Sequence, residues 1–152
     1  MSTVNIPKPA RKASLLARDA RRNGGARLSL LWVFAVLNYL YCDVMGLMDA
    51  DQLKQYLTGT VGGMHLTPGF LLGAALLMEV PMVMVLLSTF LPRAASRWAN
   101  IIAGAAMTLV QVGSLLVGSG PTIFYAFFSA VEIACTAFIV VYAWRWRPRK
   151  GL

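Results

Sequence analysis

The chain has 152 residues, of which 58% are hydrophobic and only 13% are charged, and its formal net charge is +8. The hydrophobic residues collect in four blocks of roughly 20 residues, each long enough to cross the hydrocarbon of a bilayer as a helix. A soluble domain of this length could not bury four such blocks. They lack the period-two alternation of barrel strands, so they predict an all-α integral membrane four-helix bundle.

The distribution of basic residues predicts the orientation of this bundle. Thirteen of the 14 Lys and Arg residues lie before the first block, between the second and third, or after the last, whereas Lys54 alone lies in a loop on the other side. This positive-inside bias places the N and C termini in the cytoplasm. The bias also accounts for the net charge without a nucleic acid, and it makes anionic lipid headgroups the expected partners of the basic tails.

The chain is expected to begin with a basic cytoplasmic tail over residues 1–27. A disordered tail is favoured over a short interfacial helix at residues 14–22, because the segment is polar and rich in Arg. The four-helix domain then covers residues 28–146, and its first span is predicted over residues 28–48.

An outer loop is predicted over residues 49–65. Its segment DQLKQYL, residues 51–57, has the spacing of a short amphipathic helix lying on the outer surface, with Asp49 or Asp51 as its N-cap. Three glycines follow this helix and are expected to loosen the chain: Gly59, Gly62 and Gly63.

The second span, residues 66–91, opens with Thr67-Pro68, an N-cap followed by proline at the first helical position. The third and fourth spans are predicted over residues 97–117 and 121–144, joined by a tight turn that makes them antiparallel neighbours. A basic cytoplasmic tail, residues 147–152, ends the chain. Tryptophan prefers the headgroup level, and all four tryptophans fall near the cytoplasmic ends of the spans: Trp32, Trp98, Trp144 and Trp146.

Three acids lie inside the predicted spans, and no Lys or Arg lies inside any span to pair with them. Glu79 and Glu132 are placed near the midplane, while Asp43 lies nearer the outer surface. A charged carboxylate at the bilayer centre costs about 2.5–3.5 kcal/mol. We therefore expect Glu79 and Glu132 to be neutral carboxylic acids that donate hydrogen bonds inside the bundle.

Helical spacing supplies partners for the two glutamates and predicts one buried polar layer lined by all four helices. Two interpretations of this layer stay open: interhelical hydrogen bonds that fix helix register, or a ligand-binding or proton site. Asp43 is expected at the outer headgroups or the outer loop rather than in the layer. The other residues assigned to the layer are Asn38, Asn100, Thr108, Gln111, Ser129 and Tyr125.

Neither a metal nor a cofactor is expected. Asp43, Asp49, Asp51 and His65 are acceptable ligand types, but their spacing matches no metal motif, and a single histidine cannot provide bis-histidine haem ligation. The two cysteines, Cys42 and Cys135, lie at different depths and are expected to be free thiols.

Four stretches carry a resemblance to a known family: LWVFAVLNYLYCDVMGLMD, GFLLGAALLMEVPMVMVLLS, RWANIIAGAAMTLVQ and FFSAVEIACTAFIVVYAW. They resemble a family of small bacterial four-helix integral membrane proteins catalogued as a domain of unknown function. The resemblance covers roughly residues 28–146. It implies a multi-pass protein of the bacterial inner (plasma) membrane and implies no activity.

Three interpretations of function remain. The favoured one is a non-enzymatic membrane protein whose carboxylate-centred layer binds a small molecule, lipid or quinone, or that joins a homo-oligomer or a larger membrane complex. The second is a proton-coupled carrier or channel acting as an oligomer, with Glu79 and Glu132 as protonation sites. The third is an intramembrane enzyme that uses a glutamate as general acid or base.

Overall fold

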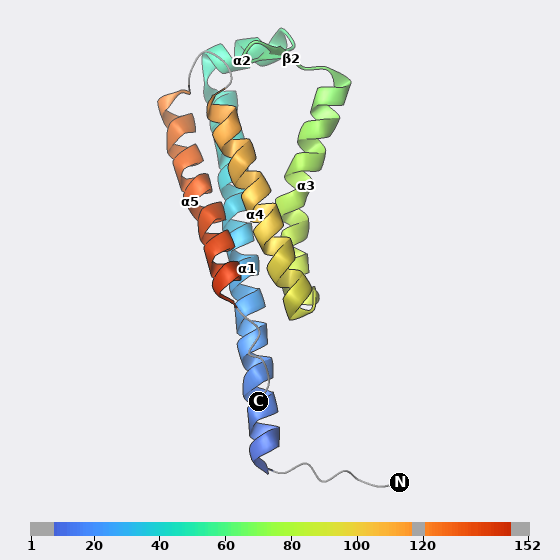
Figure 1. Cartoon of the computed structure of the whole chain (residues 1–152). Helices are drawn as coiled ribbons and strands as arrows, with labels where there is room; N and C mark the ends of the chain where they lie inside the picture. Colours follow the sequence, from blue (N-terminus) through green and yellow to red (C-terminus); the bar gives the residue numbers. More distant parts are fainter. Residues whose placement is uncertain (1–7, 117–120, 147–152) are drawn as a thin grey trace.

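The computed structural model describes the backbone of residues 8–116 and 121–146 and the side chains of residues 23–116 and 121–146. Over these residues the chain forms five helices and one two-stranded hairpin (Figure 1). In chain order they are α1 (Lys8–Met48), α2 (Ala50–Leu57), β1 (Thr60–Val61), β2 (Met64–His65), α3 (Pro68–Phe90), α4 (Arg93–Leu115) and α5 (Ile123–Arg145).

Four stretches of these helices are long and apolar enough to cross a membrane: Asn23–Met48 of α1, and the whole of α3, α4 and α5. The prediction of an all-α chain with four membrane-capable helices is thereby confirmed. The cytoplasmic placement of the termini stays a prediction. The expected tail at residues 147–152 and the first residues of the expected tail at 1–27 lie outside the described part of the chain.

Helix α1 is one continuous helix of 41 residues, and its N-terminal part projects beyond the ends of the other helices (Figure 1). The expectation of disorder across residues 1–27 is therefore wrong from Lys8 onward. Residues 8–22 are rich in Ala, Leu, Lys and Arg, which are strong helix formers. Because elongating an existing helix costs no nucleation, the membrane-capable stretch Asn23–Met48 extends readily into this segment.

The outer loop contains more regular structure than its sequence suggested. Helix α2 is capped by Asp49, whose carboxylate accepts from the backbone N–H groups of Asp51 and Gln52, as predicted. The glycines that were expected to loosen the chain instead form a β1–β2 hairpin, in which Gly62 and Gly63 make the turn with φ of 54° and 81°. Glycine has no Cβ and adopts positive φ values without strain, so Gly62 and Gly63 suit this turn.

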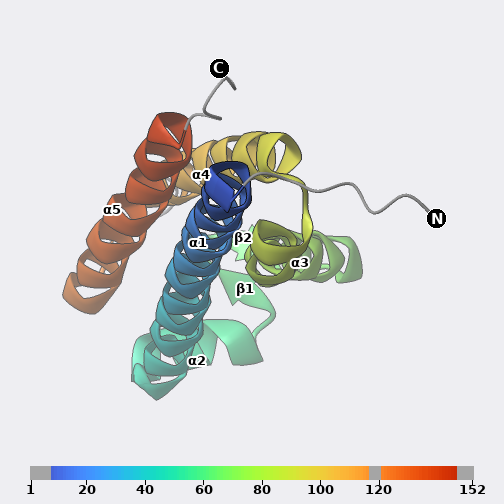
Figure 2. The same cartoon turned by 90° about the horizontal axis from the view of Figure 1, so that it is seen from below.

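Helices α3 and α5 lie on opposite sides of α1, and α4 packs against both of them (Figures 1 and 2). Two glycines permit close contacts between helices. A Cβ on Gly25 of α1 would lie 2.6 Å from the Ser88 carbonyl oxygen of α3, and a Cβ on Gly104 of α4 would lie 2.8 Å from Val140 Cγ2 of α5. The antiparallel pairing predicted for α4 and α5 is confirmed.

Helix α3 joins the bundle along only part of its length. Its buried residues are Pro81, Met84 and Ser88, and every residue from Thr67 to Leu76 is exposed. Towards the end of the molecule that carries α2, which we call the α2 end, α3 diverges from α1 and α4 (Figure 1). Residues 68–76 of α3 therefore bury little of their surface against the rest of the described chain.

Candidate functional site

At the end of the bundle opposite α2, four buried residues form a hydrogen-bonded cluster across α1, α3 and α4. This Asn100 cluster consists of Trp32, Ser88, Ser96 and Asn100, with exposed fractions of 0–2%. Trp32 Nε1 donates to Asn100 Oδ1 over 2.7 Å, and Asn100 Nδ2 donates to the Ser96 carbonyl over 2.7 Å. Ser96 Oγ donates to the Ser88 carbonyl over 3.1 Å, which closes the link back to α3.

The Asn100 cluster has the character of a structural connection. Each side chain in it has a partner, and Ser88 Oγ lies 2.6 Å from the Met84 carbonyl and 3.1 Å from Asn100 Oδ1. No polar atom is left to meet a ligand. Trp32, expected at the headgroup level, is instead fully buried because Asn100 supplies an acceptor for its N–H, whereas Trp98 and Trp144 are about half exposed, at 52% and 51%.

A second polar region lies nearer the middle of the bundle, around Glu132 of α5. The Glu132 side chain is 1% exposed, and its Oε1 atom has no hydrogen-bond partner among the described residues. The hydroxyl of Tyr39 on α1 is likewise buried and without a partner there. It lies close enough to Glu132 for the two groups to interact electrostatically. We call Glu132 and Tyr39 the Glu132 centre.

The polar side chains of α4 and α5 around this centre pair with one another rather than with the carboxyl group of Glu132. Thr108 Oγ1 and Thr136 Oγ1 are 2.7 Å apart, Gln111 Nε2 donates to Ser129 Oγ over 2.7 Å, and Tyr125 OH donates to Ser114 Oγ over 2.7 Å. These bonds stabilise the α4–α5 pair and leave the glutamate oxygen free.

The prediction of one layer containing both glutamates is wrong. Glu79 is exposed on α3 and points away from the bundle, because its α-helical position is opposite Met84 and Ser88, which pack inward. Asn38 is half-buried and donates to the carbonyl of Phe34 on its own helix. Asn100 belongs to the separate cluster near the other end. Tyr39, which directly follows Asn38 in the chain, was not among the residues predicted for this site.

The two glutamates nevertheless lie at the same height along α1. Ser29 Oγ donates to the carbonyl of Val85, and Cys135 Sγ lies 3.5 Å from the carbonyl of Leu31. At about 1.5 Å per residue, Glu79 is roughly 9 Å above the first contact and Glu132 roughly 4.5 Å above the second. Both positions correspond to the level of Ala35 on α1, so one acid faces the bundle interior and the other faces outward at the same depth.

A pocket of about 390 Å³ opens at the α2 end, between α1, α2, the hairpin and the facing ends of α4 and α5. Its carboxyl side chains are those of Asp43, Asp49 and Asp51, and its aromatic side chains are those of Tyr56, Phe124 and Tyr125. Neither Lys, Arg nor His lines it within the described part of the chain. The pocket is therefore acidic and partly aromatic.

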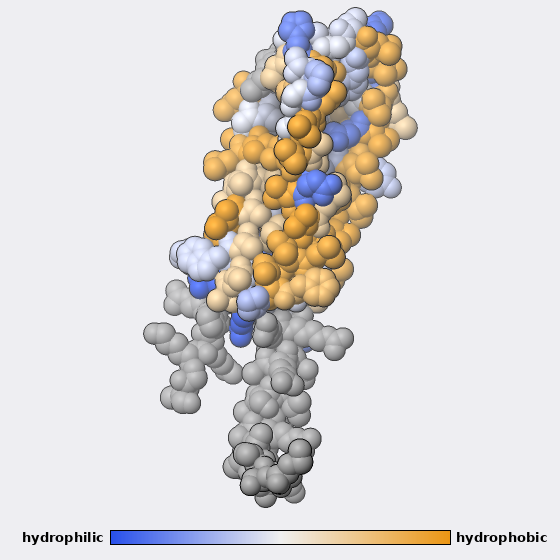
Figure 3. All heavy atoms as spheres, turned by 90° about the vertical axis from the view of Figure 1, so that its right-hand side faces the viewer, coloured by the Kyte–Doolittle hydropathy of each residue, from blue (hydrophilic) through white to orange (hydrophobic). Residues whose placement is uncertain are grey.

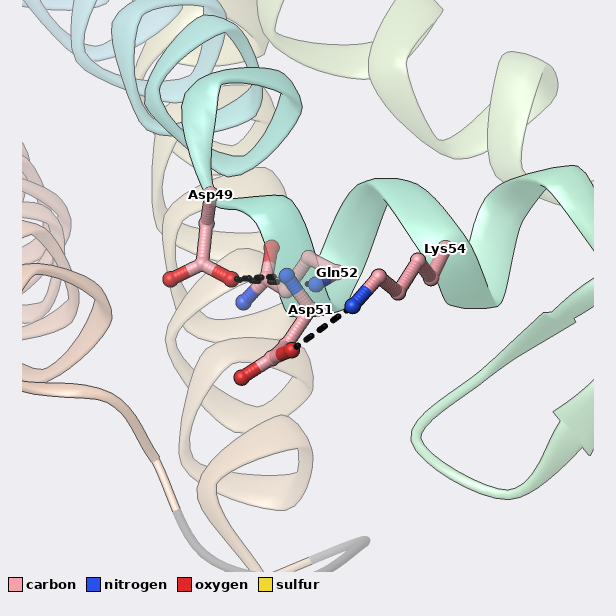
Figure 4. Close-up of polar contacts among 4 residues, drawn as sticks. All are labelled: Asp49, Asp51, Gln52 and Lys54. Atoms are coloured by element: carbon pink, nitrogen blue, oxygen red, sulfur yellow. Dashed lines mark hydrogen bonds and ion pairs between the residues drawn. The ribbon is translucent and has the colours of Figure 1, made fainter.

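The three aspartates of the pocket differ in their partners, and Figure 4 shows those of Asp49 and Asp51. Asp49 caps α2, and Asp51 lies 3.9 Å from the ammonium of Lys54. Asp43, which comes from the span itself, forms no hydrogen bond or ion pair with any described residue. Asp43 is also close enough to Glu132 to interact with it electrostatically. Asp43 is thus the carboxylate of the pocket that remains available to a ligand.

Tyr56, on α2, contributes a phenol to the same pocket. Burial raises the pKa of Tyr56 above its usual value, and the negative charge of Asp43 raises it further. Near neutral pH the phenol is therefore protonated and donates a hydrogen bond. Across residues 23–116 and 121–146, no group of three His, Cys, Asp or Glu side chains is arranged to hold a metal ion, and both Cys42 and Cys135 are free and buried.

Comparison with known proteins places the chain in a family. A model of a family of unknown function, DUF6326, matches residues 17–151. The chain belongs to this family. No curated protein and no solved structure matched it. Membership in DUF6326 therefore supplies no activity, and the pocket and the Glu132 centre are the features of this DUF6326 chain that bear on its function.

Proposed function

We propose that this protein is a non-enzymatic multi-pass membrane protein that binds a small organic cation in the pocket at the α2 end. The observation that carries the proposal is the unpaired Asp43 carboxylate in a pocket whose ionisable lining is entirely acidic. A volume of about 390 Å³ suits a small molecule. Tyr56, Phe124 and Tyr125 supply aromatic faces, which attract cations.

The packing of the rest of the described bundle supports entry from the α2 end. Leu28, Trp32, Ala35, Ile139 and Ala143 are each 0% exposed and fill the bundle at and beyond the level of Glu132. The Asn100 cluster closes the same region with satisfied hydrogen bonds. Under the positive-inside bias the α2 end faces the outside of a bacterial inner membrane, and the basic tails meet anionic headgroups of the cytoplasmic leaflet. The ligand would then arrive from outside the cell.

The test measures binding of benzylamine, which is cationic at pH 7, and of benzyl alcohol, its neutral counterpart, to the purified protein by isothermal titration calorimetry. The protein should bind benzylamine at least tenfold more tightly than benzyl alcohol. Asp43→Asn should remove most of this difference, whereas Asp51→Asn, which removes the same charge beside Lys54, should change it less than about threefold, because exposed ion pairs contribute little. Equal affinities for the two compounds would refute the proposal.

A second candidate, a proton-coupled carrier, is favoured by the Glu132 centre. Glu132 is buried with an unpartnered oxygen and interacts electrostatically with Asp43 in the pocket above it. A proton on Glu132 and a cation at Asp43 would therefore compete, which is the coupling that an exchanger needs. Benzylamine-dependent proton movement in proteoliposomes, abolished by Glu132→Gln, would favour the carrier. Benzylamine binding without proton movement would favour the binding protein over the carrier.

A further inference from the structure

The outward face of α3 carries an apolar seam with one acid at its centre. Its members are spaced alternately four and three residues apart: Leu72, Leu76, Glu79, Val83, Leu86 and Phe90. All six are exposed, the five apolar ones by 43–79%. Alternating spacing of this kind is the a/d pattern by which one helix packs along another. Figure 3, which views this side of the molecule, shows a largely hydrophobic face interrupted by isolated hydrophilic patches.

Lipid explains the apolar members of the seam but not Glu79. Glu79 lies 11 residues from Pro68 and 11 from Phe90, at the midpoint of α3. Hydrocarbon offers no hydrogen bond there, and a carboxyl group facing it carries a free-energy cost. Within residues 23–116 and 121–146, no side chain forms a hydrogen bond or ion pair with Glu79. A partner for this carboxyl group therefore has to come from another molecule with a polar group at the bilayer centre.

We propose that the partner is α3 of a second copy of the chain, packed seam to seam in a two-fold dimer with the two Glu79 carboxyl groups in contact. Copies inserted in the same orientation carry Glu79 at the same height, so a two-fold axis along the membrane normal brings the two groups together. A neutral carboxylic acid both donates and accepts a hydrogen bond, so each group satisfies the other. A lipid headgroup cannot meet this requirement at the midplane.

The geometry of α3 suits this role. The half of the helix nearest α2 diverges from its own bundle, and its residues 67–76 are all exposed, which leaves the seam accessible along its length. The seam faces away from the Asn100 cluster, the Glu132 centre and the pocket. Dimerisation is therefore independent of ligand binding at the α2 end, and either proposal can fail without the other.

The first test measures the dimer fraction in liposomes by single-molecule photobleaching over a series of protein-to-lipid ratios. Glu79→Leu should raise the dissociation constant about three- to thirtyfold, the effect of losing one or two interhelical hydrogen bonds in a membrane. Glu79→Gln, which retains a donor and an acceptor, should stay within about threefold of the wild type. Thr89→Leu, at an exposed polar position of α3 outside the seam, is the matched control and should have no effect.

The second test is disulfide cross-linking between copies in the same liposomes. Leu76→Cys, in the seam, should form a dimer on mild oxidation, whereas Ala74→Cys, at nearly the same depth but on another face of α3, should not. The wild type with its two buried cysteines gives the background. A monomeric wild type, an unchanged dissociation constant for Glu79→Leu, or equal cross-linking at the two positions would each overturn the proposal.

Discussion

Asn100 and Glu132 are both buried polar residues within the membrane-capable helices, yet their surroundings differ. The side-chain amide of Asn100 uses both of its polar atoms: Oδ1 accepts from Trp32, and Nδ2 donates to Ser96. Glu132 has a buried oxygen without a partner among the described residues. A satisfied buried polar group stabilises a fold, whereas an unsatisfied one costs free energy and is retained for another reason. One buried polar residue, Asn100, therefore stabilises the fold, whereas the other, Glu132, has a carboxyl oxygen available for chemistry.

Replacing Asn100 with leucine should destabilise the bundle. The substitution leaves the Trp32 N–H without its acceptor and removes the hydrogen bond between Ser88 Oγ of α3 and Asn100 Oδ1 of α4. We expect the free energy of unfolding to fall by about 1–3 kcal/mol, measured by denaturation in mixed detergent micelles. Thr89→Leu, on the exposed side of α3, is a control that should change it by less than about 0.5 kcal/mol. A loss no larger than that of the control would show that the cluster does not hold the helices together.

Replacing Glu132 with methionine should have the opposite effect. Methionine has a similar length and fills the same space without a polar atom, so the cost of the unpartnered oxygen disappears. The free energy of unfolding should rise by about 1–3 kcal/mol in the same denaturation experiment, while any proton-coupled activity is lost. If Glu132→Met unfolds more easily than the wild type, the glutamate is a structural residue and the carrier interpretation loses its support.

The pKa of Tyr56 depends in part on the charge of Asp43. Its pKa is raised mainly by burial and secondarily by Asp43, so the folded protein keeps the phenol proton to a higher pH than the unfolded chain does. Stability is therefore unaffected below the ordinary tyrosine pKa of about 10 and falls as the pH rises above it. The absorbance titration of the wild type minus that of Tyr56→Phe should show a midpoint above pH 10, and Asp43→Asn should move this midpoint part of the way down. A midpoint that does not respond to Asp43→Asn would place Asp43 outside the electrostatic range of the phenol.

At the scale of the elements, the end of a helix could be predicted from the sequence wherever a capping side chain or a proline at that position determines it. Thr67 and Asp49 cap α3 and α2 through their own side chains, and proline at position 92 follows the end of α3. The long helix at residues 8–22 and the glycine hairpin were misjudged. In both cases the local sequence permits several backbone conformations. Continuity with the rest of α1 selects the helix for residues 8–22, and the pairing of β1 with β2 selects the turn of the hairpin.

The inward face of each span could be predicted only in part. In α4 the polar residues Ser96, Asn100 and Gln111 mark the buried side. In α3 almost every position is apolar, and the single acid within the span suggested the wrong face, because Glu79 was taken to point inward. A polar residue in a span indicates that a polar partner exists, but it does not say whether that partner is in the same chain.

The α4–α5 contact depends on Gly104. A Cβ at this position would lie 2.8 Å from Val140 Cγ2 and 3.3 Å from the Thr136 carbonyl. Gly104→Ala should therefore cost about 1–3 kcal/mol through overpacking. Gly113→Ala, on the same helix with nothing within 4 Å of the new methyl group, should be neutral or slightly stabilising because alanine favours the helix. Equal effects of the two variants in thermal denaturation would contradict this close contact.

At the scale of the whole molecule, the two ends of the bundle differ. The α2 end holds an acidic pocket lined by Asp43, whereas the opposite end is closed by the Asn100 cluster, whose side chains are hydrogen-bonded to one another. This asymmetry favours the α2 end as the route for the ligand that we propose. Which compartment that route serves depends on the orientation of the chain in the membrane.

The charge bias predicts that the α2 end faces outward, and cysteine labelling tests this orientation. Asp51→Cys on α2 should react with a membrane-impermeant maleimide in intact spheroplasts. Ala95→Cys, exposed near the start of α4 at the opposite end, should react only after the membrane is permeabilised. The wild type gives the background of the buried Cys42 and Cys135. The reverse labelling pattern would show that the pocket opens to the cytoplasm, so that a bound cation would come from inside the cell.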